Sequence, residues 1–528
     1  MSASVPIGPA TENASPARPA DQPDSPYAWY VLFVLILVYI LSSMDRTIVS
    51  ILAEDIKKSF AVSDQQLGFL HGTAFSVFYA LFGYPMGRLI DRWHRTRLLA
   101  ISVACWSAMT MLCGMSASLV QMTFARIGVG IGEATASPAG FSLVSDWFTK
   151  KKRATALGIF IGGLSLGSGL AFLLGGMIVT QWETAFPVDP PLGLLGWQAT
   201  FIAVGMPGIL LAVLVATLRE PRRGLSDNVE KREETNIWPR FFSDLASVVP
   251  PLTLLQAARI GTGPLIANLA GAALTAAVAW TAIYLTGDTM QWTILGIGYY
   301  AAFSSAQSMK HRDPPTFALT WKTPAFLLAM IGFGLVSVIS IIMGFWVAPL
   351  ALRTFAIDKS TVGSILGLLT LCNVMGIICG GKLADVALRF SPSGRIWIGL
   401  ASAMVPAPFI VVMCNTADPW VFFTCYVPVA FFGSAWLAAG GATIQELVLP
   451  RMRGTATTTY FFASTLVGSG LGPYFVGKMS AITNDLATGI LCGLFAAPAA
   501  VFALWACMRR VEQAESSKWE RARRAGEE

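Results

Sequence analysis

The stretch GRLIDRWHR at residues 87–95 recurs in a weaker form as GKLADVALR at residues 381–389. Each copy lies at the end of a long apolar run, 66–88 in the first case and 361–384 in the second. A second echo places Gly-Ser-Gly-Leu at both 167–170 and 468–471, again in corresponding runs. Two repeats at equivalent positions indicate a duplicated chain, whose halves share one orientation and are related by a pseudo-twofold axis.

The composition is that of an all-α membrane protein. Of the 528 residues, 54% are hydrophobic and only 13% are charged, and the mean hydropathy is +0.61. Because lipid offers no hydrogen bonds to the backbone, each crossing must be a helix of about 20 apolar residues. The net charge of +7 is carried mainly by the loops, as in inserted membrane proteins, which argues against a nucleic-acid partner.

Twelve apolar runs have the length of membrane-crossing helices, and we expect them to form two six-helix bundles. The runs are approximately 28–52, 66–88, 98–116, 119–142, 154–180, 197–218, 324–350, 361–384, 395–415, 419–445, 455–480 and 487–508. Between the sixth and the seventh lie two further apolar stretches, 264–285 and 292–306, which we interpret as two extra crossings. Helices that lie along the membrane surface are the alternative for this pair.

The predicted domain organisation has five parts. They are a disordered cytoplasmic tail at 1–26, an N-terminal bundle at 27–218, a linker with two inserted helices at 219–323, a C-terminal bundle at 324–510 and a charged cytoplasmic tail at 511–528. Lys and Arg gather at 88–97, 150–153, 219–240, 310–322, 451–453 and 509–524. These segments share one side of the predicted topology, so the positive-inside rule places that side and both termini in the cytoplasm.

The sequence offers little to bind a metal or to use ATP. None of the eight cysteines forms a CxxC pair, and the three histidines are scattered, so we expect free thiols, no metal and no cofactor. The P-loop pattern GxxxxGK[ST] is absent from the chain, which disfavours transport driven by ATP.

Four ionisable side chains lie inside the apolar runs: Asp45, Arg46, Arg126 and Glu133. A charge near the bilayer centre costs about 2.5–3.5 kcal/mol on insertion scales, so such residues face one another or a wet cavity. Arg126 and Glu133 are seven residues apart, which places them on one helix face with about 10.5 Å of rise between them. We expect Asp45, from the first run, to bridge them.

We predict that Asp45, Glu133 and Arg126 couple transport to protons. Burial favours a protonated carboxyl group and a nearby guanidinium favours the ionised form, so a balance leaves a proton that exchanges near neutral pH. Arg126 is the expected switchable counter-ion, which an anionic substrate would draw away from the carboxylates. Arg46 is an alternative contact for a substrate phosphate. A static ion-pair cluster that fixes helix packing is the competing interpretation.

Glycines at positions 128, 130 and 132 precede Glu133 and leave the surface of that helix bare. Small residues of this kind allow a neighbouring membrane helix to approach closely. We therefore expect close helix packing on this side of the fourth run.

The 87–95 stretch resembles the signature loop of the major facilitator superfamily, which reads roughly G-x-L-x-D-x-x-G-R-[RK]. His94 stands where that family usually has glycine. The resemblance implies the major facilitator fold and a loop that latches the two halves together on the cytoplasmic side. The residues that it assigns to this gating loop are Gly87, Asp91, Arg92, Arg95, Asp385 and Arg389.

The two carboxylates of this loop have expected partners in the opposite half. Asp91 is expected to meet the start of the 455–480 run near Gly454, since a carboxylate near a helix N-terminus gains about 0.3–1 kcal/mol. Asp385 is expected to meet the start of the 154–180 run near Arg153. The alternative is that both only set the topology as loop charges.

The segments Ser43-Met-Asp-Arg46 and Arg126 to Ala134 resemble the spinster family within this superfamily, and the chain looks like a bacterial-type member. The resemblance covers 27–218 and 324–510 and leaves the linker outside. It implies a protein of the bacterial inner (plasma) membrane that exports amphipathic lipids, such as lysolipids or sphingoid-base phosphates. We expect it to function as a monomer among the membrane lipids.

Substrate contacts are predicted at Arg46, Arg126, Trp346, Trp436 and Tyr460. The guanidinium groups suit an anionic head and the aromatic side chains suit an apolar tail, although aromatic residues in membrane helices commonly pack in the core. His71 and Asn373 are further polar residues that either line the cavity or are satisfied in the interior.

The sequence thus predicts a proton-coupled secondary active transporter of small amphipathic substrates, an exporter or antiporter that works by alternating access. A multidrug or organic-anion antiporter of the same superfamily is one alternative, and a membrane sensor that binds its ligand without moving it is another. An enzyme is not expected, because no nucleophile is paired with a base.

Overall fold

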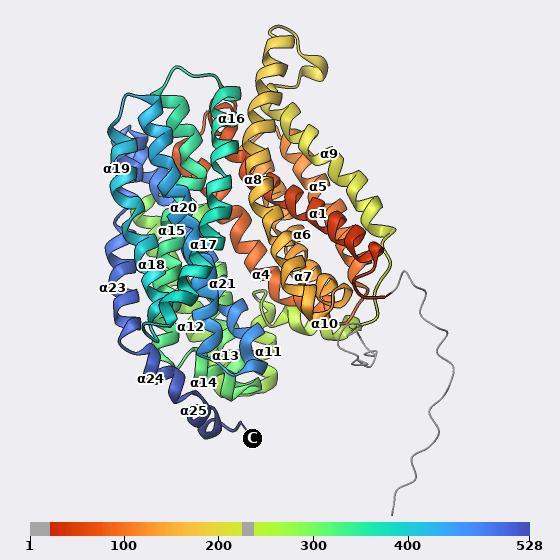
Figure 1. Ribbon diagram of the computed structural model, residues 1–528, viewed down its shortest axis with the longest axis vertical. Coiled ribbons are helices and arrows are strands. Elements are labelled where there is room, and N and C mark those ends of the chain that lie inside the picture. Colours follow the sequence, from red (N-terminus) through yellow and green to blue (C-terminus); the bar gives the residue numbers. More distant parts are fainter. Residues whose placement is uncertain (1–21, 224–236, 528) are drawn as a thin grey trace, which may run out of the picture.

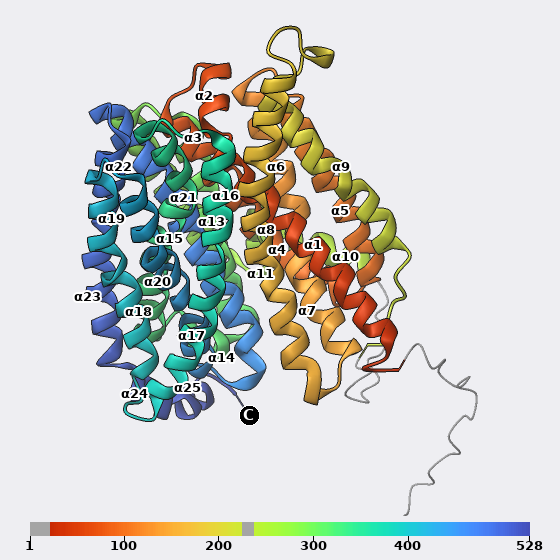
Figure 2. The ribbon, with the colours of Figure 1, turned by 45° about the horizontal axis from the view of Figure 1, so that its top comes forward.

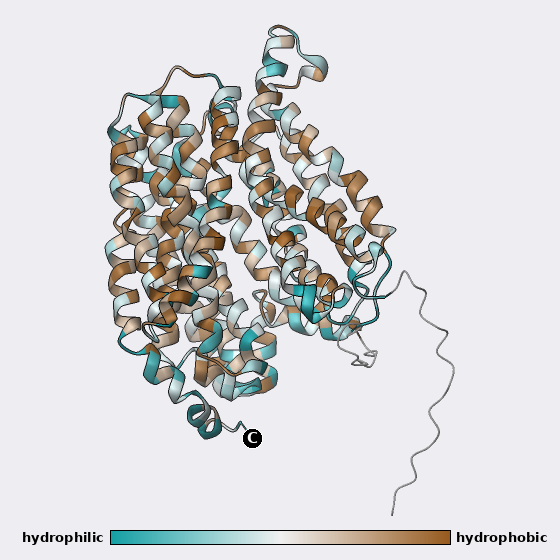
Figure 3. Ribbon diagram, viewed as in Figure 1, coloured by the Kyte–Doolittle hydropathy of each residue, from teal (hydrophilic) through white to brown (hydrophobic). Residues whose placement is uncertain are grey.

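A computed structural model describes residues 22–223 and 237–527, and every regular element within them is a helix. The helices form two groups that stand side by side, one from each half of the chain (Figure 1). Apolar residues dominate along the helices (Figure 3). Hydrophilic residues gather at the lower end of the view, around α10 (Ile237–Ala246) and around α24 (Val511–Ser516) and α25 (Lys518–Arg524) (Figure 3). In the described residues, 11 helical segments are long and apolar enough to span a membrane.

The described residues of the N-terminal half and the linker form fourteen α-helices. In the N-terminal half these are α1 (Pro26–Ile51), α2 (Ala53–Phe60), α3 (Asp64–His71), α4 (Thr73–Ile90), α5 (Arg95–Gly114), α6 (Leu119–Glu133), α7 (Ala136–Trp147), α8 (Lys150–Ala185) and α9 (Gly196–Ala216), with a 3₁₀ turn at Pro191–Gly193. The described part of the linker contains α10 (Ile237–Ala246), α11 (Leu252–Ile260), α12 (Thr262–Thr286), α13 (Thr289–Arg312) and α14 (Pro314–Thr320).

The C-terminal half repeats this architecture and ends in two short helices. Its elements are α15 (Pro324–Thr354), α16 (Lys359–Leu369), α17 (Leu371–Leu388), α18 (Gly394–Met404), α19 (Pro406–Asn415), α20 (Pro419–Glu446), α21 (Arg453–Thr483), α22 (Leu486–Gly493) and α23 (Ala496–Met508), with a 3₁₀ turn at Pro450–Met452. The terminal helices are α24 (Val511–Ser516) and α25 (Lys518–Arg524).

Several apolar runs that were predicted as continuous spans are broken helices. The 66–88 run divides into α3 and α4 at Gly72, and the 395–415 run divides just before Pro406. Pro406 has no N–H to donate to the preceding turn, which explains the second break. At Gly72, a Cβ atom would lie 2.2 Å from the carbonyl oxygen of Ser469 in α21. Only glycine therefore permits this contact between the two halves.

We call the end of the molecule that carries Pro26 and α25 the terminal face, and the end that carries α2 the opposite face (Figure 2). The halves pack closely near the opposite face, where a Cβ on Gly176 of α8 would lie 2.4 Å from the Lys359 carbonyl oxygen of α16. One apolar cluster there is shared by both halves and contains Leu52 and Leu350. Two other clusters are built mainly from one half each. The halves therefore diverge toward the terminal face.

The linker helices α12 and α13 form a hairpin that runs between the two faces. Its turn lies near the opposite face, where Asp288 accepts hydrogen bonds from Gln65 (2.7 Å) and Lys478 (2.9 Å). Along its length, Leu295 of α13 packs between Val77 of α4 and Leu466 of α21. The hairpin thus fills the seam between the halves on one side. Of the two helices, α12 is long and apolar enough to span a membrane.

Candidate functional site

A cavity of about 300 Å³ lies between the two halves. The N-terminal half supplies its charged and aromatic lining, and the C-terminal half supplies mainly small residues. The lining residues are Arg46, Thr47, His71, Phe75, Ser76, Tyr79 and Arg126 from α1, α3, α4 and α6, and Ser340, Ile341, Gly344, Thr465 and Ser469 from α15 and α21. Arg46 and Arg126, two of the predicted substrate contacts, are therefore brought together in one cavity.

Arg46 forms an ion pair with Glu133 at the wall of this central cavity. Its Nε lies 2.6 Å from Oε2 of Glu133, which also accepts a hydrogen bond of 2.8 Å from the Ser42 hydroxyl. The Glu133 side chain is fully buried, whereas the Arg46 side chain is 28% exposed. The Arg46 guanidinium also lies over the ring of Tyr79, 4.4 Å from its centroid. Arg46, rather than Arg126, is thus the counter-ion of Glu133.

Arg126 keeps unused hydrogen-bonding capacity in the central cavity. Its Nη1 donates to the main-chain carbonyl of Asp45 (2.8 Å), and its Cζ lies 5.1 Å from the centroid of the Phe75 ring. Its Nε and Nη2 are buried and have no hydrogen-bond partner among the described residues. A buried guanidinium with free donors is costly unless a ligand or water satisfies it. Arg126 is therefore poised to receive an anionic group.

The side chain of Asp45 does not bridge Arg126 and Glu133, contrary to the expectation from helix spacing. Asp45 is completely buried, and neither of its carboxylate oxygens has a hydrogen-bond partner in the part of the chain that the structure describes. Its link to Arg126 passes through the main chain instead. Burying a carboxyl group without hydrogen-bond partners is costly, so Asp45 is a costly residue to hold at this place.

Two of the expected glycine contacts hold the charged helix in place. A Cβ on Gly130 would lie 2.5 Å from the Phe75 carbonyl oxygen, and one on Gly132 would lie 2.8 Å from the Cβ of Trp106. Helix α6 therefore packs directly on α4 and α5 at the level of the charged residues. The predicted close approach of a neighbouring helix is confirmed.

A second cavity of about 220 Å³ lies within the C-terminal half and adjoins the first. The two cavities share Ser340 and Gly344 in their linings. The residues that line only the second cavity are Ile339, Met343, Asn373, Pro406, Tyr426, Val429, Ala430, Gly433, Ser434, Trp436 and Leu437. We call it the C-terminal pocket, to distinguish it from the central cavity.

The predicted aromatic contacts fall in different places. Trp436 lines the C-terminal pocket. Trp346 is fully buried and donates from Nε1 to the Pro473 carbonyl oxygen (3.1 Å), and Tyr460 is fully buried in an apolar cluster. Neither Trp346 nor Tyr460 lines either cavity. In this conformation both side chains pack in the core, which was the alternative to a substrate contact. His71 lines the central cavity, and Asn373 lines the C-terminal pocket.

Two aromatic residues of the site were not predicted. Phe75 lies close to both guanidinium groups, at 5.0 Å from Arg46 and 5.1 Å from Arg126, and Tyr79 contacts Arg46. A signal for them existed in the sequence, because His71, Phe75 and Tyr79 follow one another at four-residue spacing in the second apolar run. Residues at that spacing share one helix face.

Within the described residues, the ion pairs of the predicted gating loop are made with its own half or with the linker. Arg92 pairs with Asp244 of α10 (2.8 Å), and Arg95 is buried between Asp146 (2.5 Å) and Glu220 (2.6 Å). Arg88, beside them, also pairs with Asp244. Arg95 thus braces the N-terminal half, and in this conformation it does not reach across to the other half.

The carboxylates of this loop do not bridge the halves either. Asp91 is exposed, and Asp385 is 74% exposed with Arg395 of its own half as its ion-pair partner (3.5 Å). A Cβ on Gly454 would have nothing within 4 Å. The expected contacts of Asp91 with Gly454 and of Asp385 with Arg153 are not formed in this conformation. Gly87 and Arg389 likewise lie near the C-terminal ends of α4 and α17, without a bridge to the other half.

The opposite face carries an inter-half network that was not predicted. Arg353 of α15 holds Asp64 of α3 through two hydrogen bonds of 2.7 Å each, and its Nε donates to Glu54 of α2 (2.8 Å). Lys359 of α16 contacts Asp55 of α2 at 2.6 Å. These residues form what we call the opposite-face network.

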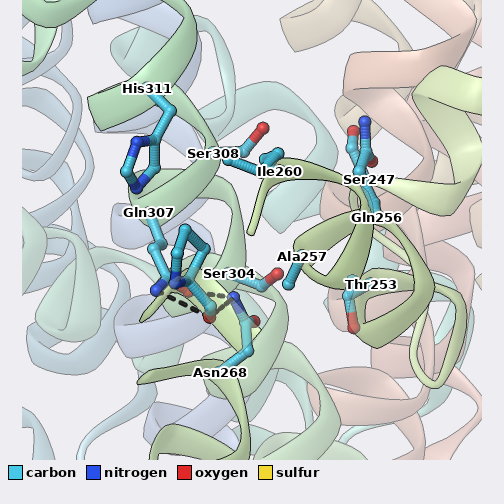
Figure 4. Close-up of a pocket in the computed structure, with 11 residues that line it drawn as sticks. Ser247, Thr253, Gln256, Ala257, Ile260, Asn268, Ser304, Gln307, Ser308 and His311 are labelled. Atoms are coloured by element: carbon cyan, nitrogen blue, oxygen red, sulfur yellow. Dashed lines mark hydrogen bonds between the residues drawn. The ribbon is translucent and has the colours of Figure 1, made fainter. Parts of the chain in front are cut away.

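A separate small pocket lies within the linker, between α11, α12 and α13 (Figure 4). Asn268 donates to the side chain of Gln307 and to the Pro264 carbonyl oxygen (3.2 Å), so much of its polar lining is satisfied internally. Its free volume is about 10 Å³. That is roughly the room needed by one water molecule, too little for a lipid head group.

The sequence matches a known protein family. The family model described as Major Facilitator Superfamily matches residues 35–352. The chain belongs to the major facilitator superfamily. It is therefore a multi-pass integral membrane protein with the fold of a transporter family, and the predicted fold class is confirmed.

Relatives within the major facilitator superfamily include efflux and spinster proteins. The chain is 26% identical to an MFS-type efflux pump of Mycolicibacterium smegmatis, over 85% of this chain and 84% of the relative. It is 23% identical to protein spinster homolog 1 of Xenopus laevis, over 84% of this chain and 72% of the relative. A shorter match, 32% identical over 204 residues, links it to the sphingosine-1-phosphate transporter SPNS2 of Danio rerio, with 37% of each chain covered.

A solved structure supports the same fold. A bacterial homolog of the human lysosomal transporter Spinster, in an inward-facing and unoccupied conformation, aligns with a TM-score of 0.65. The two chains are 24% identical, and the alignment covers 95% of this chain and 98% of the other. The predicted resemblance to spinster proteins is thus confirmed as a likeness in sequence and in fold.

Proposed function

We propose that this protein is a proton-coupled secondary active transporter of anionic amphipathic lipids, with lysolipids or sphingoid-base phosphates as the substrate class. The observation that carries the proposal is a pair of adjoining cavities that differ in charge. The central cavity presents the free donors of Arg126, and the lining residues of the C-terminal pocket include no charged side chain. A molecule with an anionic head and an apolar tail matches both.

The substrate head would bind between Arg126 and Arg46. Both guanidinium groups line the central cavity, and Phe75 lies close to each of them. A planar guanidinium offers two parallel donors to a phosphate, which gives both affinity and orientation. A head group at this place would satisfy the buried donors of Arg126 that have no protein partner.

Proton coupling would work through Glu133 and Asp45. An anion that draws Arg46 away leaves Glu133 buried without its counter-ion, and Glu133 then favours a proton. Binding of the anion and of the proton at this site therefore promote each other, as linkage requires. Coupling of this sign favours movement of both in one direction. An exchange of lipid for protons, expected from the sequence, would need a head group that competes with protons for a carboxylate.

The orientation and the conformation follow from the charge distribution. The loops rich in Lys and Arg lie at the terminal face, which the positive-inside rule assigns to the cytoplasm. The halves are joined at the opposite face and diverge toward the terminal face, so we assign an inward-facing conformation. Both cavities are enclosed by the two halves of one chain, which supports a monomer as the functional unit.

The decisive experiment is flux of a labelled anionic lysolipid in proteoliposomes, with a proton gradient of either sign. Arg126→Ala should lower the apparent affinity about 30-fold or more, because removing one partner of a buried charged contact costs about 2–5 kcal/mol. Arg126→Lys retains the charge but loses the planar fork, and should fall between native protein and Arg126→Ala. Glu133→Gln should transport lipid without responding to the gradient. Native protein that moves no lysolipid would contradict the proposal.

A multidrug exporter is the second candidate, because the relative from M. smegmatis is an efflux pump that matches most of this chain. The apolar C-terminal pocket also suits an apolar drug. A panel of cationic and neutral dyes in the same vesicles separates the two. Transport of dyes that is insensitive to Arg126→Ala, with no lysolipid flux, would favour the efflux pump.

A further inference from the structure

The two cavities adjoin along one face of α15. Ser340 and Gly344 belong to the linings of both the central cavity and the C-terminal pocket. They are four residues apart on the same helix, so they occupy the same helix face on consecutive turns. A ligand that extends from one cavity into the other along this border passes these two residues.

Gly344 leaves this border open. A Cβ atom built on Gly344 would have no heavy atom within 4 Å, so the space in front of it is empty. Its neighbours along α15 are different, since Met343 and Phe345 are buried in the apolar core. The glycine is not required by close packing against another helix. The role of Gly344 therefore lies in the space that its missing side chain leaves empty.

The C-terminal pocket has the chemistry of an acyl-chain site. The Ser340 hydroxyl donates to the Gly433 carbonyl oxygen (2.5 Å), and Trp436 Nε1 donates to that same oxygen (2.8 Å). The Ser434 hydroxyl donates to the Asn373 carbonyl oxygen (2.8 Å). These polar groups are already satisfied, so the pocket presents mainly carbon surface. Burial of an apolar chain against such surface is favourable.

We propose that Gly344 is the aperture through which the acyl chain of the substrate enters the C-terminal pocket, and that it sets the accepted chain length. This inference rests on the proposed function, because it assumes an amphipathic substrate with its head at Arg126. With the head held there, a long chain has to pass Gly344, whereas a short chain ends within the central cavity. A larger side chain at 344 closes the route for long chains only.

The test compares two lysophosphatidic acids, with a palmitoyl or a hexanoyl chain, in flux measurements on reconstituted full-length protein. Gly344→Leu should lower kcat/KM for the palmitoyl lipid at least about tenfold more than it lowers kcat/KM for the hexanoyl lipid. Gly344→Ala, which adds one methyl group, should leave the ratio near that of native protein. Gly263→Leu on α12 is the matched control, since Gly263 also has nothing within 4 Å and lines neither cavity.

The outcomes separate the aperture from the proposed function. Equal loss of both lipids in Gly344→Leu, or no loss of either, would overturn the aperture while transport by native protein still supports the function. Absence of flux for both lipids in native protein would overturn the function itself. A substitution that unfolds the protein is detected by its thermal melting curve.

A second measurement uses native protein and needs no variant. A palmitoyl lysolipid with a photoreactive diazirine at the chain end is bound, illuminated and mapped by mass spectrometry. We expect labels on Met343, Tyr426 or Val429, which line the C-terminal pocket. Labels confined to Phe75 and Tyr79 of the central cavity, or to the exposed face of α12, would overturn the proposal.

Discussion

The two faces of the molecule join the halves in different ways. At the opposite face, Arg353 and Lys359 of the C-terminal half hold Asp64 and Asp55 of the N-terminal half. At the terminal face, where Lys and Arg gather, the ion pairs of Arg92, Arg95 and Arg451 within the described residues stay in one half or reach the linker. Similar chemistry thus accompanies a closed end and an open end. The difference lies in which partner each of these bases finds.

The linker accounts for part of this difference. Asp244 of α10 holds Arg88 and Arg92 beside the predicted gating loop of the N-terminal half. At the start of α14, Asp313 contacts Arg451 in the loop before α21 of the C-terminal half (3.2 Å). Each half therefore has terminal-face bases that are occupied by a linker carboxylate. A linker built in this way stabilises the conformation in which the terminal face is open.

The largest expected effect comes from breaking the opposite-face network. Arg353→Ala removes the bidentate partner of Asp64, whose side chain is only 4% exposed and which keeps Lys57 (2.6 Å) as an ion-pair partner. Because Lys57 still compensates the Asp64 charge, the loss is that of the charged hydrogen bonds, about 1.5–3 kcal/mol. The population ratio should therefore shift more than about tenfold toward an open opposite face. Distances between nitroxides on α2 and α16, measured by double electron–electron resonance, check this.

Lys58→Ala is the control for this experiment, because Lys58 is an exposed base on the same helix α2. It should leave the distance distribution unchanged. A distribution that Arg353→Ala does not alter would show that apolar packing alone, including the close contact of Gly176 with α16, holds this face shut.

Much of the fold could be predicted from the sequence, because it depends on short-range sequence patterns. The apolar runs and the repeated 87–95 stretch depend only on residues close together in the chain. The two inserted helices α12 and α13 were also within reach, since each begins in an apolar stretch between the two bundles. The breaks within α3–α4 and α18–α19 were missed, because the interpretation followed apolar composition and did not use Gly72 and Pro406, where the helices are interrupted.

The sequence predicted that the charged side chains of α1 and α6 lie together, but not how they pair. Asp45 and Arg46 are adjacent, so they point in different directions from one helix, and the spacing of Arg126 and Glu133 does not tell which of the two reaches them. Only the rotation of α1 decides that Arg46 meets the Glu133 carboxylate while Asp45 meets Arg126 through its carbonyl oxygen. Helix rotation results from the packing of the whole bundle.

The same reason explains the missed aromatic residues and the missed network. Whether Trp346 or Trp436 faces a cavity depends on the rotation of α15 and α20. The opposite-face network joins Asp64 to Arg353, which are far apart in the chain and lie in segments where the sequence showed only ordinary loop charges. No short-range pattern connects such residues.

A smaller effect is expected from breaking the linker contacts at the terminal face. Asp244→Asn removes the ion pairs that hold Arg88 and Arg92 to α10. These two bases of the N-terminal half can then approach the C-terminal half. Since partly exposed ion pairs contribute about 1 kcal/mol at most, the population should shift about fivefold toward a closed terminal face. Nitroxide pairs across the terminal face measure this shift. Glu512→Gln, an exposed carboxylate of α24, is the control, and a shift toward a more open face would contradict the role given to the linker.

The smallest expected effect concerns the second linker carboxylate and its dependence on pH. Burial raises the pKa of Asp313, but hydrogen bonds from Thr316 and Arg451 outweigh burial and leave its pKa below the ordinary value. The contact with Arg451 is therefore fully formed above about pH 4 and is lost only as the pH falls through the depressed pKa. It does not titrate between pH 5 and pH 8.

Flux at varied pH in the proteoliposomes tests this assignment directly. The pH profile of Asp313→Asn should superimpose on that of native protein between pH 5 and pH 8, with a slightly altered amplitude. Glu133→Gln should flatten the same profile, because its carboxyl group lies in the central site and pairs with Arg46. If Asp313→Asn also flattened the profile, protons would act at the terminal face as well, and the two faces would differ in their response to protons and not only in their ion-pair partners.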